Sequence, residues 1–287
     1  MQTRHRLICL SILLLSALSL GAVSISAPRD ADNPNVRFGM PSLAKADSNH
    51  RDDYLIARSQ YVLSYNATTR TPNWVSWTLR RSDIGKAKRG DFEPDTSLPA
   101  GFIRVTAGVY TKSGFDRGHM CPAQDRSSDQ ADMDATFRMT NIIPQSPALN
   151  QHAWERLESY CRTLAKDHAL YISCGPHGTG GEGKNGHANE IGTDKVKVRV
   201  PAKVWKVILV LPDEDAEPRR NTRTIAVIMP NDQSVGDDWA RYRVSVREVE
   251  RLTGYKFFRK VDPDIAAAIK RDPDTVKVRT PKTKARP

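Results

Sequence analysis

Four consecutive residues, Asp116, Arg117, Gly118 and His119, place a carboxylate, a guanidinium group and an imidazole within one short segment. The downstream residues Asn141, Asn150 and Glu158 add two amides and a second carboxylate. Hydrolysis of a phosphodiester needs a general base that works near neutral pH, and it needs positive charge on the phosphoryl oxygens. The set therefore indicates phosphodiester cleavage with one hard metal ion and a histidine base.

Each of these residue types suits a separate task in that reaction. His119 is the candidate general base, because an imidazole can accept a proton near neutral pH. Mg²⁺ retains most of its waters, so the amide oxygen of Asn150 would suffice as a direct protein ligand. Glu158 could accept a hydrogen bond from the hydrated ion. Arg117 could bind the phosphate or brace the site, and Asp116 could orient the loop or a catalytic group.

The element that must carry two of these residues is a helix. A serine followed by a proline at 146–147 is a typical helix start, and no proline or glycine follows until after Lys166. Asn150, Trp154 and Glu158 have the spacing of one helical face. Trp154 is expected in the core, with a stripe of apolar residues formed by Leu149, Ala153, Leu157, Tyr160 and Leu164.

Two strands are expected before this helix. Residues 136–143 are rich in β-branched and apolar side chains, and Pro144 should end that strand. Residues 114–119 resemble the end of another strand. The local order of strand, loop, strand and helix places His119 at a strand end and Asn150 in the first helical turn. A phosphate could lie between them, near the positive end of the helix dipole.

This arrangement resembles the DNA/RNA non-specific endonuclease family, whose members are nucleases of the ββα-metal, or His-Me finger, type. The general-base histidine of the family corresponds to His119, and its metal-binding asparagine corresponds to Asn150. The acidic helix residue corresponds to Glu158 and the strand asparagine to Asn141, for which a purely structural role beside the site is the alternative. Glu155, one turn from Glu158, is a rival acidic residue.

The resemblance covers roughly residues 50 to 260. Residues 61–66 and 72–77 resemble the first strands of the family, and residues 89–95 resemble its stretch with another phosphate-binding arginine. Arg89 matches that arginine better than the adjacent Lys88 does. The resemblance implies cleavage of DNA and RNA with little sequence specificity, 5′-phosphate products, and Mg²⁺ as cofactor with Mn²⁺ as the alternative ion.

The N-terminus predicts export. Arg4, His5 and Arg6 form a basic segment, and the apolar run at 7–20 has the length of a signal-peptide core. We therefore expect a signal peptide at 1–27 and a secreted or periplasmic protein without a stable membrane partner. An uncleaved membrane anchor is the alternative.

The remainder predicts a linker at 28–50, one nuclease domain at 51–262 and a basic, disordered tail at 263–287. The formal charge of +11 falls to +9 when Arg4 and Arg6 leave with the signal peptide, and such a balance favours a polyanionic partner such as DNA or RNA. The alternation of Lys195, Lys197 and Arg199 with valines predicts a strand with one basic face, which could also be an ordinary solvated face. A homodimer is compatible with this sequence.

The remaining cysteines are Cys121, Cys161 and Cys174, because Cys9 lies in the predicted signal peptide. One disulfide with one free thiol, or no disulfide, are both compatible with an odd number of cysteines. Their spacing does not match a paired structural zinc site. The glycine-rich run at 178–184 lacks the serine or threonine and the following helix of a phosphate-binding P-loop, so it predicts a glycine-rich loop.

The other elements indicate an α+β fold. Buried strands are expected at 169–174, 204–211 and 224–229, and a short helix at 245–252 should end at Gly254. Since strands and helices do not alternate regularly, we expect a ββα-metal nuclease core on a mixed, largely antiparallel sheet with flanking helices. Two other functions fit less well: an exported nucleic-acid-binding protein without turnover, and a phosphodiesterase or phosphatase for small substrates.

Overall fold

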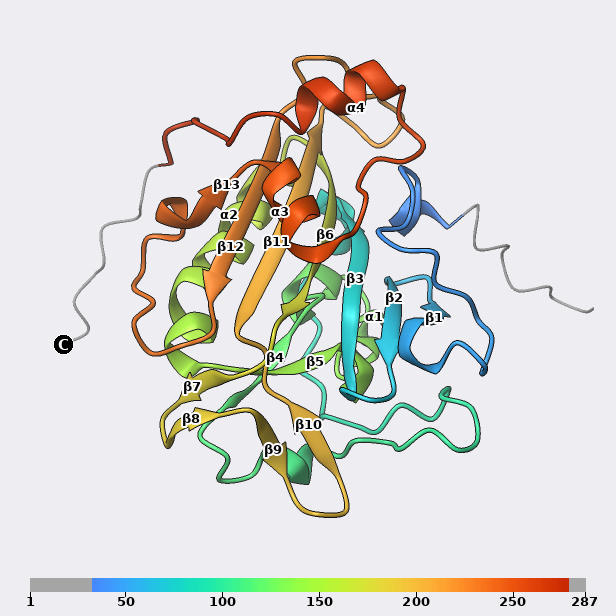
Figure 1. Cartoon of the computed structure of the whole chain (residues 1–287). Helices are drawn as coiled ribbons and strands as arrows, with labels where there is room; N and C mark the ends of the chain where they lie inside the picture. The colour runs from blue at the N-terminus through green and yellow to red at the C-terminus, as the bar shows by residue number, and fades with distance from the viewer. Residues whose placement is uncertain (1–32, 279–287) are drawn as a thin grey trace, which may run out of the picture.

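The computed structural model describes residues 33–278, so the predicted signal peptide at 1–27 lies outside the described residues. The central feature is a seven-stranded sheet in the order β1-β2-β3-β6-β11-β12-β13, in which every neighbouring pair is antiparallel (Figure 1). Its strands are β1 (Tyr54–Ala57), β2 (Val62–Asn66), β3 (Thr71–Leu79), β6 (Ala169–His177), β11 (Lys203–Leu211), β12 (Thr224–Pro230) and β13 (Arg243–Val244). The predicted α+β class with a largely antiparallel sheet is confirmed.

Three two-stranded sheets and four α-helices complete the described part of the chain. The small sheets pair β4 (Asp116–His119) with β5 (Ile142–Gln145), β7 (Gly181–Gly183) with β8 (Gly186–Ala188), and β9 (Glu190–Gly192) with β10 (Lys197–Arg199). The helices are α1 (Gln130–Ala135), α2 (Glu155–Leu164), α3 (Val246–Thr253) and α4 (Pro263–Ile269). Among residues 33–278, no helix has both the length and the apolar character to cross a membrane.

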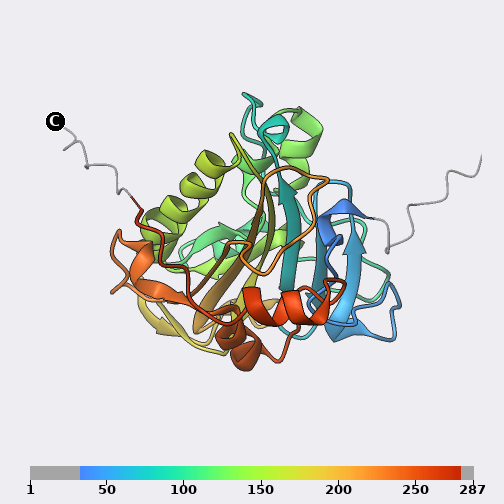
Figure 2. The same cartoon turned by 90° about the horizontal axis from the view of Figure 1, so that it is seen from above.

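Both faces of the large sheet are covered, which explains the nearly continuous apolar run of β11. Val204 and Ile208 belong to the core cluster that contains residues of α2, whereas Trp205 and Val207 belong to the cluster that contains residues of α3 and α4. Figure 2 shows α2 on one side of the sheet and α3 with α4 on the other. One position in β11 departs from the apolar pattern, since Lys206 lies on the α2 side and is only 1% exposed.

Several predicted elements are confirmed at nearly their expected bounds. The predicted strands at 169–174, 204–211 and 224–229 correspond to β6, β11 and β12. Helix α3 begins with a capping box between Ser245 and Glu248, and it ends at Gly254, whose φ of 77° suits glycine. The glycine-rich run at 178–184 forms part of the β7–β8 hairpin and leads into no helix.

The predicted strand at 136–143 is wrong over most of its length. Helix α1 reaches Ala135, a short 3₁₀ turn occupies Met139–Asn141, and only β5 from Ile142 onward is extended. The cause is the Asn141 side chain, whose Nδ2 donates to the carbonyl oxygens of Thr136 and Cys121, each at 2.9 Å. These bonds stabilise a turn where the side-chain pattern alone favours a strand.

The predicted linker at 28–50 is wrong for residues 33–50. Val36, Phe38 and Ala44 are buried in the core on the α3 side of the sheet. Asn35 is also buried, and it accepts a hydrogen bond from the backbone of Thr78 at 3.0 Å while donating to the carbonyl of Ser59 at 2.8 Å. This segment therefore packs along β3 as part of the domain.

The predicted disordered tail at 263–287 is wrong for residues 263–278, and residues 279–287 lie outside the described residues. Asp262 caps α4 through the amides of Asp264 and Ile265. Beyond the helix, the side chain of Asp274 is 2% exposed and binds Arg223 through two bonds of 2.9 Å, with Arg243 3.7 Å away. This cluster ties the C-terminal segment to the sheet.

We expect Asp274→Ala to lower the free energy of unfolding by about 2 kcal/mol, because two partly buried arginines lose their carboxylate. Urea unfolding followed by tryptophan fluorescence measures the change. Asp272→Ala is the matched control, since that carboxylate is 67% exposed and should change stability by less than about 0.5 kcal/mol. Equal effects of the two substitutions would contradict a role for the Asp274 cluster in holding the tail.

Candidate active site

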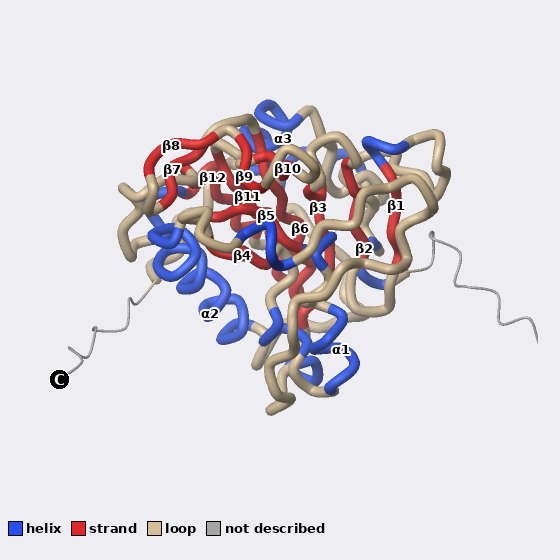
Figure 3. Tube along the Cα trace, turned by 90° about the horizontal axis from the view of Figure 1, so that it is seen from below, coloured by secondary structure: helices blue, strands red, loops and turns tan. Residues whose placement is uncertain are grey.

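Five of the predicted site residues line one cleft between the β4–β5 pair and helix α2: Arg89, Arg117, His119, Asn150 and Glu158. Its volume is about 360 Å³. Figure 3 shows β4 and β5 beside α2 on the lower side of the sheet. The cleft is lined by Arg89, Arg117, His119, Pro122, Ala123, Gln124, Asn150, Gln151, Glu155, Glu158 and Arg162.

The pairing of β4 with β5 positions His119. Asp116 to His119 form β4, and their register opposite β5 places Gly118 across from Ile143. A Cβ atom at Gly118 would lie 2.1 Å from the Oε1 atom of Gln145, so only glycine allows the two strands to approach this closely. The glycine of the motif is therefore required by packing.

His119 packs against two phenylalanine rings that also contact each other. The ring centroids of Phe92 and Phe137 are 5.3 Å and 4.8 Å from that of the imidazole. Nε2 of His119 is buried and has no hydrogen-bond partner within residues 33–278. Burial, together with the charge of Arg89, lowers the pKa of His119 to about 3. The imidazole is therefore neutral at neutral pH, as a general base must be.

The same two rings carry the two predicted phosphate-binding arginines. The guanidinium of Arg117 lies 4.9 Å from the ring centroid of Phe92, and that of Arg89 lies 5.0 Å from the ring centroid of Phe137. Neither guanidinium makes an ion pair among the described residues, so both remain available to an anionic ligand. Lys88 does not line the cleft, so the geometry selects Arg89 rather than its neighbour.

Phe92 and Phe137 were not among the predicted site residues. The only feature of the sequence that indicates a site role for Phe92 is its place three residues after Arg89. Phe137 lies in the segment for which the sequence predicts a strand that does not form.

Asn150 is oriented by Asp116. The Nδ2 atom of Asn150 donates to Oδ2 of Asp116 at 2.9 Å, and Gln151 donates to the same oxygen at 2.8 Å. The bond from Asn150 fixes the orientation of its side-chain amide. The Oδ1 atom of Asn150 accepts no hydrogen bond within residues 33–278. A free, hard amide oxygen in a cleft that also holds the Glu158 carboxylate is a suitable ligand for Mg²⁺.

The helix that carries Asn150 starts as predicted at Pro147, but its first turns differ from the expected geometry. Leu149–Trp154 form a π-helix before α2 begins, and Trp154 is buried in the core while Asn150 and Glu158 line the cleft. The three residues therefore do not share one face, because the wider turn rotates Trp154 inward. The hydroxyl of Ser146 donates to the carbonyl of Asp232 at 2.7 Å and does not cap the helix.

Glu158 lines the inner end of the cleft and is 13% exposed. Its Oε1 atom lies 3.7 Å from Nζ of the buried Lys206. The ammonium of Lys206 also lies 4.1 Å from the ring centroid of Trp154 and 5.6 Å from that of Trp77. Burial raises the pKa of Glu158 to about 7, although Lys206 acts in the opposite direction. Nothing in the sequence indicates this pair, because Lys206 lies in an apolar strand far from the Asp116–His119 segment.

Asn141 does not line the cleft. It is fully buried, and both ends of its amide are used by the backbone: Oδ1 accepts from the amide of Cys121 at 2.9 Å, and Nδ2 donates to two carbonyls. These bonds fix the chain that follows His119, as the structural alternative for this residue expects.

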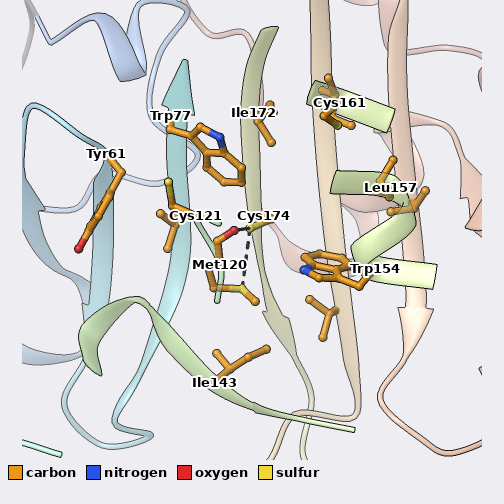
Figure 4. Packing of buried hydrophobic residues seen from close by; sticks show 14 of the residues in the cluster. Tyr61, Trp77, Met120, Cys121, Ile143, Trp154, Leu157, Cys161, Ile172 and Cys174 are labelled. Atoms are coloured by element: carbon orange, nitrogen blue, oxygen red, sulfur yellow. Dashed lines mark hydrogen bonds between the residues drawn. The ribbon is translucent and has the colours of Figure 1, made fainter. Parts of the chain in front are cut away.

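The three cysteines within the described residues are buried and free. The Sγ atom of Cys174 donates to the carbonyl of Met120 at 3.4 Å, and Figure 4 shows this contact beside Trp77 and Trp154. Burial raises the pKa values of Cys161 and Cys174 to about 12. Of the two expectations for these residues, the one without a disulfide is confirmed, and no cluster of three or more His, Cys, Asp or Glu side chains within residues 33–278 could hold zinc.

The cleft brings together groups suited to phosphodiester chemistry, and the comparisons with known proteins show the class: the protein is a nuclease. A model of the family described as "DNA/RNA non-specific endonuclease" matches residues 41–264. The chain therefore belongs to the DNA/RNA non-specific endonuclease family.

Relatives with established names agree with this assignment. The chain is 45% identical over 237 residues to a nuclease of Nostoc sp., covering 81% of this chain and 83% of the relative. It is 34% identical over 231 residues to human mitochondrial endonuclease G, covering 77% and 72% of the two chains. Among solved structures, endonuclease G in complex with its inhibitor EndoGI superposes with a TM-score of 0.67 at 29% identity, over 83% of this chain and 95% of that one.

Proposed function

We propose that this nuclease is exported and hydrolyses both DNA and RNA with little sequence specificity, with His119 as the general base and Mg²⁺, or Mn²⁺, held by Asn150. The observation that carries the proposal is the cleft itself, in which a neutral imidazole, two guanidinium groups without acidic partners and a free amide oxygen face the same space. That combination fits a phosphodiester and a hard cation better than it fits a neutral substrate.

The chain's own residues divide the reaction between them. His119 accepts the proton of the attacking water, and its neutral state lets it do so at physiological pH. Arg117 and Arg89 bind the non-bridging phosphate oxygens, with their guanidinium groups already held over the rings of Phe92 and Phe137. Asp116 accepts a hydrogen bond from Nδ2 of Asn150, which orients the amide and leaves its Oδ1 atom free.

The metal ion would be held by Asn150 directly and steadied by Glu158 through its hydration shell. When bound there, it would supply positive charge to the phosphoryl oxygens and the leaving oxygen. A single neutral ligand is sufficient because Mg²⁺ commonly keeps several of its waters in protein sites.

The direct test uses the chain without residues 1–27, incubated with supercoiled plasmid and with RNA in Mg²⁺ or in EDTA. Cutting of both polymers only in the presence of the metal is the expected result. Binding of nucleic acid without cutting would instead favour an exported nucleic-acid-binding protein, and cutting that persists in EDTA would remove the metal from the proposal.

Export and assembly are separate parts of the proposal. Expression of the full chain in a bacterial host, followed by N-terminal sequencing of the periplasmic protein, should place cleavage near residue 27. A full-length protein retained in the membrane fraction would instead support the anchor. Light scattering of the purified enzyme distinguishes a monomer from a homodimer.

The pH dependence of the reaction near neutrality should follow the ionisation of Glu158 rather than that of His119. Glu158 acts in its ionised form, and its pKa of about 7 means that this form is lost as pH falls through neutrality. His119, with a pKa of about 3, stays neutral throughout that range. We therefore expect kcat/KM to fall below pH about 7.

Lys206→Met removes the cation that favours the ionised form of Glu158, so the pKa of Glu158 should rise and the acid limb should move to higher pH by about one unit. The profile is measured between pH 5.5 and 9. Lys203→Met on the same strand is the control, because Lys203 is exposed and should leave the profile in place. An unchanged profile in the Lys206 variant would exclude its action through Glu158.

A further inference from the structure

A larger groove continues from the catalytic cleft. Its volume is about 870 Å³, more than twice that of the cleft, and the two cavities share Arg89, Ala123, Gln124 and Arg162. One wall is the C-terminal half of α2, and the other is formed by residues 81–89 together with Met133 of α1. Figure 3 shows α1 and α2 on opposite sides of this region.

Charge is distributed unevenly between the two cavities. The catalytic cleft is lined by two carboxylates, Glu155 and Glu158, and by the three guanidinium groups of Arg89, Arg117 and Arg162. The groove is lined by four cationic side chains and one carboxylate: Arg81, Arg89, Arg162, Lys166 and Asp167. The groove is thus the part of this surface that favours a polyanion without a metal ion.

Besides Arg89, two of these cations have no polar partner within the described residues. The side chains of Arg81 and Lys166 are exposed and make no hydrogen bond or ion pair within residues 33–278. They lie on opposite walls, since Arg81 begins a short 3₁₀ helix and Lys166 follows the end of α2. The groove lining also includes the apolar side chains of Ile84 and Met133, on the same wall as Arg81. Cationic and apolar side chains in one groove suit a nucleotide, which has a charged phosphate and a flat, weakly polar base.

The wall at 81–89 is fixed rather than loose. The amide of Gly85 donates to Oγ of Ser127 at 2.9 Å, and the amide of Ala87 donates to the carbonyl of Ser127 at 2.9 Å. A Cβ atom at Gly85 would lie 2.6 Å from that carbonyl oxygen, so glycine is needed for the close approach. The groove is therefore formed before any ligand arrives, which limits the entropy cost of binding.

We propose that this groove binds the nucleotides on one flank of the scissile phosphodiester, with Arg81 and Lys166 contacting the sugar-phosphate backbone. The inference rests on the proposed nuclease function, and it adds a direction to it: the substrate strand leaves the catalytic cleft along α2 toward Lys166. Pockets of about 300–1,000 Å³ hold drug-sized ligands, so the groove accommodates about one or two nucleotides.

The first test compares long and short substrates. In Arg81→Ser/Lys166→Ser, the ratio of kcat/KM for a 20-nucleotide single strand to that for a dinucleotide phosphate should fall about tenfold. The dependence of binding on salt should also weaken, by a slope of about 1.4 for two lost phosphate contacts on a single strand. Both DNA and RNA strands are assayed, because the proposed contacts are to the backbone.

The control is Arg251→Ser/Arg259→Ser, which removes the same charge from exposed positions outside both cavities. This variant should retain the wild-type ratio. An equal fall in both double variants would show that net charge alone is responsible and would overturn the proposal. An equal loss on long and short substrates in the groove variant would overturn it as well.

A second test follows the direction of the strand. End-labelled oligonucleotides should show that the wild type avoids cutting within one or two nucleotides of one terminus, because the groove is then empty. The groove variant should lose this avoidance, and a symmetric wild-type pattern would contradict the inference.

A binding measurement distinguishes an error in the groove proposal from an error in the proposed nuclease function. Fluorescence anisotropy in EDTA, with the His119→Ala background, measures the affinity for a labelled strand without turnover. A loss of affinity on Arg81→Ser/Lys166→Ser in this background supports the groove even if the wild type proves inactive. Unchanged affinity overturns the groove and leaves the nuclease proposal intact.

Discussion

Replacement of His119 by alanine is expected to lower the rate of phosphodiester cleavage by about 10²–10⁴-fold, the usual range for loss of a positioned general base. Binding of nucleic acid should remain, because the guanidinium groups of Arg117 and Arg89 rest on phenylalanine rings and do not depend on the imidazole. Single-turnover cleavage of plasmid and of RNA, with affinity measured in parallel, tests both halves of the expectation.

The control for this substitution is His168→Ala. His168 is exposed and lies in the turn after α2, outside the catalytic cleft, so its loss should leave the rate within about twofold of the wild type. If His119→Ala retained most of its activity, the water would have to be activated by another group, and the assignment of His119 as base would fail.

Replacement of Asn150 by alanine is expected to lower both the rate and the affinity for Mg²⁺ by more than about tenfold, since the proposed site has only one direct protein ligand. The variant should need a higher Mg²⁺ concentration for half-maximal activity. Titration calorimetry with Mg²⁺, or electron paramagnetic resonance with Mn²⁺, measures the affinity without relying on turnover.

Two neighbouring variants sharpen this test. Asp116→Ala releases the amide of Asn150 and should weaken metal binding by about 10–100-fold, as loss of a partner that orients a ligand does. Gln151→Ala removes the other donor to the same carboxylate but leaves Asn150 held, so its effect should be much smaller. A metal titration that is unchanged in Asn150→Ala would exclude Asn150 as the ligand.

The parts of the site that could be predicted from the sequence are those that depend on local chemistry. The Asp116–His119 segment forms a strand and α2 follows at the expected place, because proline, glycine and side-chain periodicity act over a few residues. These short-range signals suffice to predict that His119, Arg117, Asn150 and Glu158 share one cleft. The match to Arg89 rather than Lys88 also agrees with the residues that line it.

The features that could not be predicted depend on residues distant in the chain. Lys206 meets Glu158 only because β11 pairs next to β6 under α2, and nothing in the apolar run around Lys206 indicates a carboxylate partner. Residues 33–50 look polar, yet a few isolated apolar side chains and Asn35 fix them against β3. Phe137 contacts His119 because Asn141 bends a segment that its composition would extend.

The burial of Cys121, Cys161 and Cys174 gives the molecule an internal reporter of its own opening. A thiol reagent or oxidant can reach these sulfur atoms only when the core between the sheet and α2 is exposed. The rate of thiol labelling under native conditions should therefore equal the rate of large-scale unfolding when labelling outpaces refolding, and should be proportional to the unfolded population when refolding is faster. In an oxidising environment, the chemical lifetime of this enzyme is then set by the stability of its fold rather than by the reactivity of its cysteines.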